Sequence, residues 1–172
     1  MSSIDRFKAN ISGGGARANQ YMVTFGSVAG AVFEQKTQFL VKTTQLPGQT
    51  ITEIPVNFRG RILNLVGDRT FNPWSITVLN DTDFKIYRGL ERWMNGMNNM
   101  TDNEGLTNPV DYQVDAFVDH LDRNGNNVKS YTLRGLFPTE IGGIDLSMGE
   151  ATEIETFGVT FEYQYFETNT TT

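Results

Sequence analysis

Short runs of alternating apolar and polar residues dominate the chain, and a period of two is typical of strands in half-buried sheets. The runs cover residues 19–25, 36–44, 50–58, 61–66, 74–79, 112–121, 128–136 and 153–166. This pattern predicts a mainly β protein in which antiparallel strands build the core.

The runs in the second half of the chain are the longest. Residues 112–121 and 128–136 are separated by a segment that contains Asn124 and Gly125, and Asn-Gly between alternating runs is the strongest short hairpin signal. The last run holds about fourteen residues, which at roughly 3.3 Å per residue would extend more than about 40 Å. Long strands leave unpaired edges, which an assembly can use for contacts between copies.

The run at residues 50–58 contains a proline. Pro55 cannot donate a hydrogen bond to a neighbouring strand, so this segment is predicted to be an edge strand, a bulged strand or an extended arm. Gly67 and Asp68 follow the next run and predict a turn.

One helix is predicted, over residues 83–97. Asn80, Asp81 and Thr82 precede it and offer side chains that can cap its first turn. Its apolar residues recur every three or four positions and form a stripe that we expect to pack on the core, namely Phe84, Tyr87, Leu90, Trp93, Met94 and Met97. Residues 95–109 are predicted to form a polar loop.

The two ends of the chain differ from its middle. Residues 1–18 are rich in Gly, Ser, Ala and Asn and are expected to form a flexible arm, and residues 168–172 a polar tail. Between them, residues 19–167 are expected to form a single domain. The polar start predicts no secretory signal, and no apolar run is long enough to predict a membrane anchor.

The net charge of −6 is unevenly distributed. Residues 1–100 carry 11 basic and 7 acidic side chains, whereas residues 101–172 carry 3 basic and 13 acidic ones. The acidic part is interpreted either as a solvated face or as a surface that meets a basic part of another copy. The acidic balance argues against a protein that grips DNA phosphates.

Candidate catalytic chemistry is sparse. The chain has no cysteine, and its one histidine, His120, lies in a predicted strand without a metal-ligand motif or a serine motif around it. Residues 13–15 are glycines, but no phosphate-loop motif follows them. The segment from Asp122 resembles the start of a calcium loop, yet Asn127 and Leu133 stand where the loop needs Gly and Glu. We therefore predict no catalytic residue, cofactor or metal site, and no enzyme activity.

A row of carboxylates is the remaining candidate site. Asp111, Asp115 and Asp119 are spaced by four, which in one strand would place all three on the face opposite to the core. Such a row is interpreted as a solvated strand face or as the wall of a channel that carries DNA, where negative charge repels phosphate. Acid–base chemistry in a hydrolase is a further hypothesis for these carboxylates.

Three blocks of residues, in this order and spacing, resemble the tail tube proteins of contractile-tailed bacteriophages. The first block consists of Leu46, Pro47, Gly48, Ile54, Pro55, Val56, Phe58, Arg61, Gly67, Asp68, Arg69, Thr70, Phe71, Trp74, Asn80 and Asp81. The second consists of residues 135–139 and 141–142, including Gly135 and Pro138. The third consists of Glu153, Ile154, Glu155, Thr156, Phe157, Val159 and Thr160. The resemblance extends over residues 20–167.

The resemblance implies an antiparallel β-sandwich or barrel-like fold with one flanking helix and an extended hairpin arm. It implies hexameric rings stacked into a hollow tube, with the sheath around it, a tape-measure protein inside, baseplate and tail terminator proteins at its ends, and DNA in transit without sequence-specific binding. It further implies a location in the virion tail, after assembly in the host cytoplasm. By position, the arm that contacts the adjacent ring would contain Ile54, Pro55, Val56, Phe58 and Arg61.

The same tube fold is shared by bacterial contractile injection systems of the secretion and bacteriocin types. A tube that delivers protein is therefore the alternative to a DNA conduit.

Overall fold

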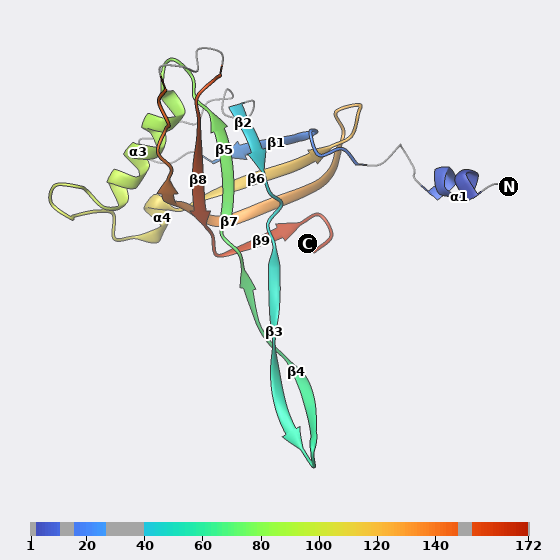
Figure 1. Ribbon diagram of the computed structural model, residues 1–172. Coiled ribbons are helices and arrows are strands. Elements are labelled where there is room, and N and C mark those ends of the chain that lie inside the picture. The colour runs from blue at the N-terminus through green and yellow to red at the C-terminus, as the bar shows by residue number, and fades with distance from the viewer. Residues whose placement is uncertain (1–2, 11–15, 27–39, 148–152, 172) are drawn as a thin grey trace.

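The computed structural model describes residues 3–10, 16–26, 40–147 and 153–171 (Figure 1). Its elements are α1 (Ser3–Asn10), β1 (Tyr21–Phe25), β2 (Val41–Thr44), β3 (Gln49–Phe58), β4 (Arg61–Phe71), β5 (Trp74–Leu79), α3 (Lys85–Met97), α4 (Pro109–Tyr112), β6 (Val114–Leu121), β7 (Asn127–Ile141), β8 (Thr156–Glu162) and β9 (Tyr165–Thr168). Every strand pairing is antiparallel, which confirms the predicted mainly β class.

The strands of the body form two layers that cross steeply (Figure 1). The back sheet contains β1, β6, the first part of β7 and β9. The front sheet contains β2, β5, β8 and the last part of β7. Sheets that cross in this way are joined at corners by strands that pass from one sheet to the other.

Strand β7 makes such a corner at Gly135. Residues before it pair with β6 and β9, and Phe137–Ile141 pair with β8. Gly135 has a φ of 64°, a left-handed conformation that bends the strand and that glycine adopts without steric cost.

The last strand bends at the same corner. The prediction of one long strand over residues 153–166 is wrong, because β8 ends at Glu162 and β9 begins at Tyr165. Both strands pair with β7, but with its two different halves, so the chain has to change sheet together with β7. Of the strands that the structure describes, the 15-residue β7 is the longest instead.

The core lies between the two sheets. Val114, Ala116 and Val118 of β6 are buried, as the alternation of that segment predicts. The front sheet contributes the largest buried side chains, Trp74, Phe157 and Phe161. Helix α3 packs on this core, with the ring of Tyr87 5.1 Å from that of Phe157, and the ring of Trp93 6.2 Å from that of Phe161.

The start of α3 differs from the prediction. The residue before the helix is Phe84, with a φ of 50°, and no side chain caps the first turn. The Asn80 side chain instead donates a 3.0 Å hydrogen bond to the Glu155 carboxylate. The predicted capping is therefore wrong. The Asn80 side chain, one of the three predicted caps, bonds to Glu155 and not to the first turn of the helix. Ile86, outside the predicted stripe, is buried with Leu90 and Trp93.

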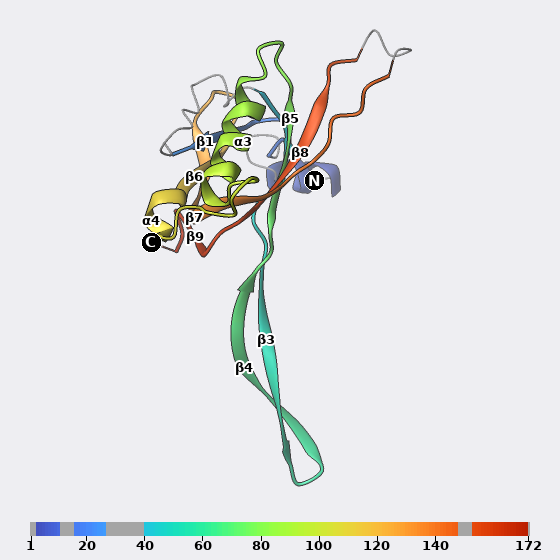
Figure 2. The same ribbon diagram turned by 90° about the vertical axis from the view of Figure 1, so that its left-hand side faces the viewer.

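Strands β3 and β4 form a two-stranded arm that leaves the body at one end (Figures 1 and 2). Arg59 and Gly60 make its tip, both with positive φ, as in the tight turns that suit a hairpin. Pro55 lies opposite Asn64 within this arm, so of the three predicted alternatives the extended arm is confirmed. The turn predicted at Gly67 and Asp68 is wrong, since both lie inside β4.

The two ends contain more structure than their composition indicates. Residues 3–10 form α1, on which Ile4 and Phe7 are exposed. At the other end, Thr168 closes β9 and is buried, and its hydroxyl shares hydrogen bonds with those of Thr170 and Thr171. The division of the chain into arm, domain and tail stays a prediction.

Candidate assembly surfaces

The arm is exposed along almost its whole length. All ten residues of β3 are exposed, and β4 is almost as open. The register places Ile54, Val56 and Phe58 across from Leu65, Leu63 and Arg61, so these six share one face. The five apolar side chains of this face are between 40% and 64% exposed. An apolar surface of this kind on a two-stranded arm marks a site of association.

The root of the arm, by contrast, is fixed. The Trp74 indole donates hydrogen bonds to the Thr44 hydroxyl at 3.1 Å and to the Gln45 carbonyl at 2.8 Å. Phe71, at the end of β4, packs its ring 6.0 Å from that of Tyr163. The segment with Leu46, Pro47 and Gly48 joins β2 to β3 here, and the backbone N–H of Asn72 donates a hydrogen bond to the Gly48 carbonyl. The arm therefore projects from an anchored base.

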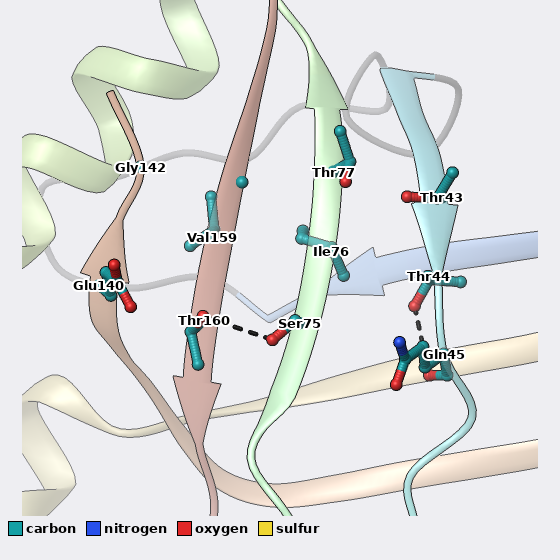
Figure 3. Close-up of a pocket in the computed structure, with 11 residues that line it drawn as sticks. Thr43, Thr44, Gln45, Ser75, Ile76, Thr77, Glu140, Gly142, Val159 and Thr160 are labelled. Atoms are coloured by element: carbon teal, nitrogen blue, oxygen red, sulfur yellow. Dashed lines mark hydrogen bonds between the residues drawn. The ribbon is translucent and has the colours of Figure 1, made fainter. Parts of the chain in front are cut away.

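The outer face of the front sheet is lined by hydroxyls (Figure 3). Thr43 lies beside Thr77 across β2 and β5, and Ser75 lies beside Thr160 across β5 and β8. The Ser75 and Thr160 hydroxyls share a 3.3 Å hydrogen bond. A shallow hollow of about 290 Å³ runs over this face, and Glu140 is the one charged residue among those that line it. The described residues that line this hollow include no lysine or arginine.

The sequence interpretation missed this face. Ser75 and Thr77 alternate with the buried Trp74, Ile76 and Val78, so the alternation contained the signal. Alternation predicts only that one face of a strand is exposed. Hydroxyl side chains are uncharged, so no charge pattern in the sequence distinguishes this face from other exposed faces.

Each sheet ends in strands, or parts of strands, that pair with only one other strand among those described. In the part of the chain that the structure describes, β2 and the Phe137–Ile141 part of β7 are the edges of the front sheet, and β1 and β9 those of the back sheet. Open edges present rows of backbone N–H and C=O groups that can pair with another copy.

The predicted aspartate row is not one continuous row. Asp111 lies in α4, where Pro109 begins a short helix, while Asp115 and Asp119 lie on the outer face of the back sheet with the exposed Phe117. Asp115 forms an ion pair with Arg134 at 2.5 Å, and the Gly135 amide donates to it.

The charged side chains near Asp115 also form hydrogen bonds and ion pairs within the subunit. Arg134 forms a second ion pair with Glu167, at 2.9 Å, and its hydrogen bonds to Asp115 and then to Glu167 raise the pKa of the guanidinium. Asp119 accepts a 2.8 Å hydrogen bond from the Asn127 side chain. These contacts tie β6, β7 and β9 together on the outer face of the back sheet.

The turn from Asp122 to Asn126 joins β6 to β7 and confirms the predicted hairpin. The Asp122 carboxylate accepts hydrogen bonds from the backbone amides of Asn124 and Asn126 and from the Asn126 side chain. The bond from the Asn126 side chain is the largest cause that lowers the pKa of Asp122.

Among the described residues, no group of three His, Cys, Asp or Glu side chains is arranged to hold a metal ion. None of the helices in this part of the chain is both long and apolar enough to cross a membrane.

The residues that carry the family resemblance lie mostly in strands. Gly67 to Phe71 lie in β4, and Pro138 is buried in β7. Thr156 and Phe157 begin β8, and Glu153 is exposed just before that strand.

Comparison of the coordinates with solved structures shows the same fold in contractile injection machines. The sheath/tube terminator of the PVC extracellular contractile injection system matches with a TM-score of 0.67 at 9% identity, over 90% of this chain and 96% of that chain. The PVC sheath-tube complex matches with a TM-score of 0.60 at 10% identity, over 98% and 99%. At these identities the likeness concerns the fold alone.

Sequence comparison is more specific. The tail tube protein gp19 of Enterobacteria phage T4 is 32% identical over 164 residues, which cover 95% of this chain and 98% of that protein. The tail tube protein of Serratia phage KSP90 is 30% identical over 172 residues, which cover 97% of this chain and 96% of that protein. The family model described as phage tail tube protein matches residues 6–169. The two-layer β fold with its projecting arm thus belongs to a member of the phage tail tube protein family.

Proposed function

We propose that this chain is the structural subunit of a hollow inner tail tube, in which hexameric rings stack inside a contractile sheath and conduct DNA into the host. The observation that carries this proposal is the arm, since a ten-residue strand exposed along its whole length leaves apolar side chains open to contact with another copy. The protein acts through assembly and has no catalytic role.

Ring closure would use the edges of the front sheet. If β2 of one copy pairs with the Phe137–Ile141 edge of the next, the front sheets of a ring join into one barrel and no front-sheet edge stays open. The two edges are different, so the contact is head-to-tail, and such contacts form a ring when the rotation between neighbouring copies closes.

The hydroxyl-lined outer face of the front sheet would then form the bore. Thr43, Ser75, Thr77 and Thr160 hydrate well, and among the described residues that line the hollow on this face there is no lysine or arginine to retain phosphate. A bore lined by Asp111, Asp115 and Asp119 is the other proposal. It is less well supported, because Asp111 is off the strand and Asp115 is paired with Arg134.

The remaining partners follow from the same assembly. The sheath would lie outside the tube, a tape-measure protein inside it before ejection, and baseplate and terminator proteins at its ends, with the tube assembled in the host cytoplasm and carried in the virion tail. The injection-system alternative has less support, since the injection-system structures reported above are only 9% to 10% identical, whereas the phage relatives reach 30% to 32%.

The arm would contact the adjacent ring through the face that contains Ile54, Val56 and Phe58, with Pro55 on the opposite face and Arg61 next to the tip. Stacking would cover apolar side chains that water surrounds in the single subunit.

Electron microscopy of the purified protein tests the proposal. The wild type is expected to form rings and tubes, and Val56→Asp with Leu63→Asp is expected to abolish stacking, because both carboxylates fall on one rung of the apolar face. Asn64→Asp with Val66→Asp adds the same charge on the opposite face, further from the tip, and is the matched control. Equal stacking by both variants, or a wild type that stays monomeric at high concentration, would contradict the proposal.

A further inference from the structure

The tip of the arm combines two cations with apolar side chains. Arg59 and Arg61 flank Gly60, and the Arg59 guanidinium lies 5.3 Å from the centre of the Phe58 ring. Phe58 is 64% exposed and Ile62 66% exposed. Neither arginine forms an ion pair with a carboxylate of the described residues. In the single chain, the tip is therefore a basic and apolar knob without a counterpart.

A hollow of about 480 Å³ lies where β8 begins, and its chemistry is the reverse of that of the tip. Leu146 and Ile154 in its lining are 79% and 68% exposed. Three carboxylates, those of Asp145, Glu153 and Glu155, surround these apolar side chains. Only Glu155 has a polar partner that the described residues supply, the amide side chain of Asn80.

The knob and the hollow lie at opposite ends of the molecule. The arm leaves one end of the body, and β8 begins at the other end (Figures 1 and 2). One chain therefore cannot bring its own tip to its own hollow. Two different patches at opposite ends join copies in an open, repeating series along an axis.

We infer that the tip of the arm, residues 58–62, docks into the hollow lined by Asp145, Leu146, Glu153, Ile154 and Glu155 of a copy in the next ring. Phe58 and Ile62 would cover Leu146 and Ile154, and the two arginines would meet the carboxylates. The inference rests on the proposed stacking of rings and adds where the arm binds. An arm whose two strands have ten and eleven residues spans about 30 Å, which is long enough to leave its own body and enter a neighbouring one.

This contact would explain the division of charge along the sequence. The tip supplies two cations from the basic first part of the chain, and the hollow supplies three carboxylates from the acidic last part. Opposite charges steer the two ends together and select one direction of stacking, because tip against tip and hollow against hollow would bring like charges together. The expected result is a tube with a single polarity.

Charge reversal with rescue tests the inference. Arg59→Glu with Arg61→Glu is expected to shorten tubes at least about tenfold, since like charges at a contact cost several kcal/mol. Asp145→Lys with Glu153→Lys should do the same. A mixture of the two variants should restore contacts between the reversed tip of one and the reversed hollow of the other. Arg69→Glu, at the root of the arm, is the matched control and should leave tube length unchanged.

Cross-linking gives an independent measurement, because the chain contains no cysteine. In Ile62→Cys with Leu146→Cys, a short bismaleimide should link copies into a ladder of oligomers when tubes are present. Ile62→Cys with Phe117→Cys places the second thiol on the back sheet and should give no such ladder.

The outcomes separate the inference from the function on which it rests. A wild type without rings or tubes would overturn the proposed function. Wild-type tubes together with full-length tubes of the Arg59→Glu, Arg61→Glu variant, or cross-linking that is equal for both cysteine pairs, would overturn the docking site alone. A midpoint of thermal unfolding equal to that of the wild type would establish that the subunits of each variant are folded.

Discussion

The corner of β7 contains one glycine with a left-handed backbone conformation, Gly135. The variant Gly135→Ala tests how much this residue contributes to the stability of the subunit. At Gly135 the backbone has a φ of 64°, and an added Cβ would lie 2.9 Å from Cγ of Gln164 and 3.1 Å from Oε1 of Gln113. The left-handed conformation alone costs an L-residue roughly 1–2 kcal/mol. Both close atoms belong to flexible glutamine side chains, which can move, so the contacts add a smaller amount.

The total for Gly135→Ala is then about 1–3 kcal/mol. For a domain of this size, each kcal/mol lowers the midpoint of thermal unfolding by about 2–4 °C. We therefore expect a midpoint about 2–12 °C below that of the wild type. Circular dichroism of the unassembled subunit, with urea unfolding as a second probe, measures this change.

Two matched variants separate the causes. Gly125 has a φ of 81°, but no atom lies within 4 Å of an added Cβ. Gly125→Ala therefore measures the free-energy cost of the left-handed backbone conformation alone. Gly158→Ala has neither a positive φ nor a close atom, and it should be neutral or slightly stabilising. The expected order of midpoints is Gly158→Ala, then Gly125→Ala, then Gly135→Ala. A Gly135→Ala variant as stable as Gly158→Ala would refute the claim that this residue shapes the corner.

Three further predictions concern single side chains. The Tyr163 hydroxyl is buried without a hydrogen-bond partner in the described structure, and burial, with the Glu162 charge, raises its pKa to about 12. Wild-type stability should therefore fall as pH rises from about 10 to 12, and Tyr163→Phe should remove this part of the pH dependence in unfolding titrations. Trp74→Phe loses both indole hydrogen bonds at the root of the arm and should cost about 1–3 kcal/mol in urea unfolding. Asp115→Asn should lower the thermal midpoint at low salt, and the difference should shrink in 1 M NaCl, where screening acts over about 3 Å.

Local patterns in the sequence were enough for the strands that pack directly on the core. Trp74–Leu79 has the predicted bounds because its alternation matches one buried and one open side along its whole length. The buried face of β6 follows from the same rule. The arm was open to prediction because Pro55 excluded an inner strand.

Features that depend on distant parts of the chain escaped the sequence interpretation. The break after Glu162 arises from the bend of β7, and residues 153–166 alone contain no signal for it. Asp111 shares the spacing of Asp115 and Asp119, but Pro109 begins a helix that removes Asp111 from the strand. The hollow proposed as the docking site combines residues 145–147 with residues 153–156, so no single stretch of sequence displays it.

A cryo-electron microscopy reconstruction of the assembled tube tests the central claim most directly. The account predicts sixfold rings in which β2 of each copy pairs with residues 137–141 of the next, with Thr43, Ser75 and Thr160 facing the bore. Subunits that form no closed ring, or a bore lined by the outer face of the back sheet with Asp115 and Asp119 towards the axis, would contradict it.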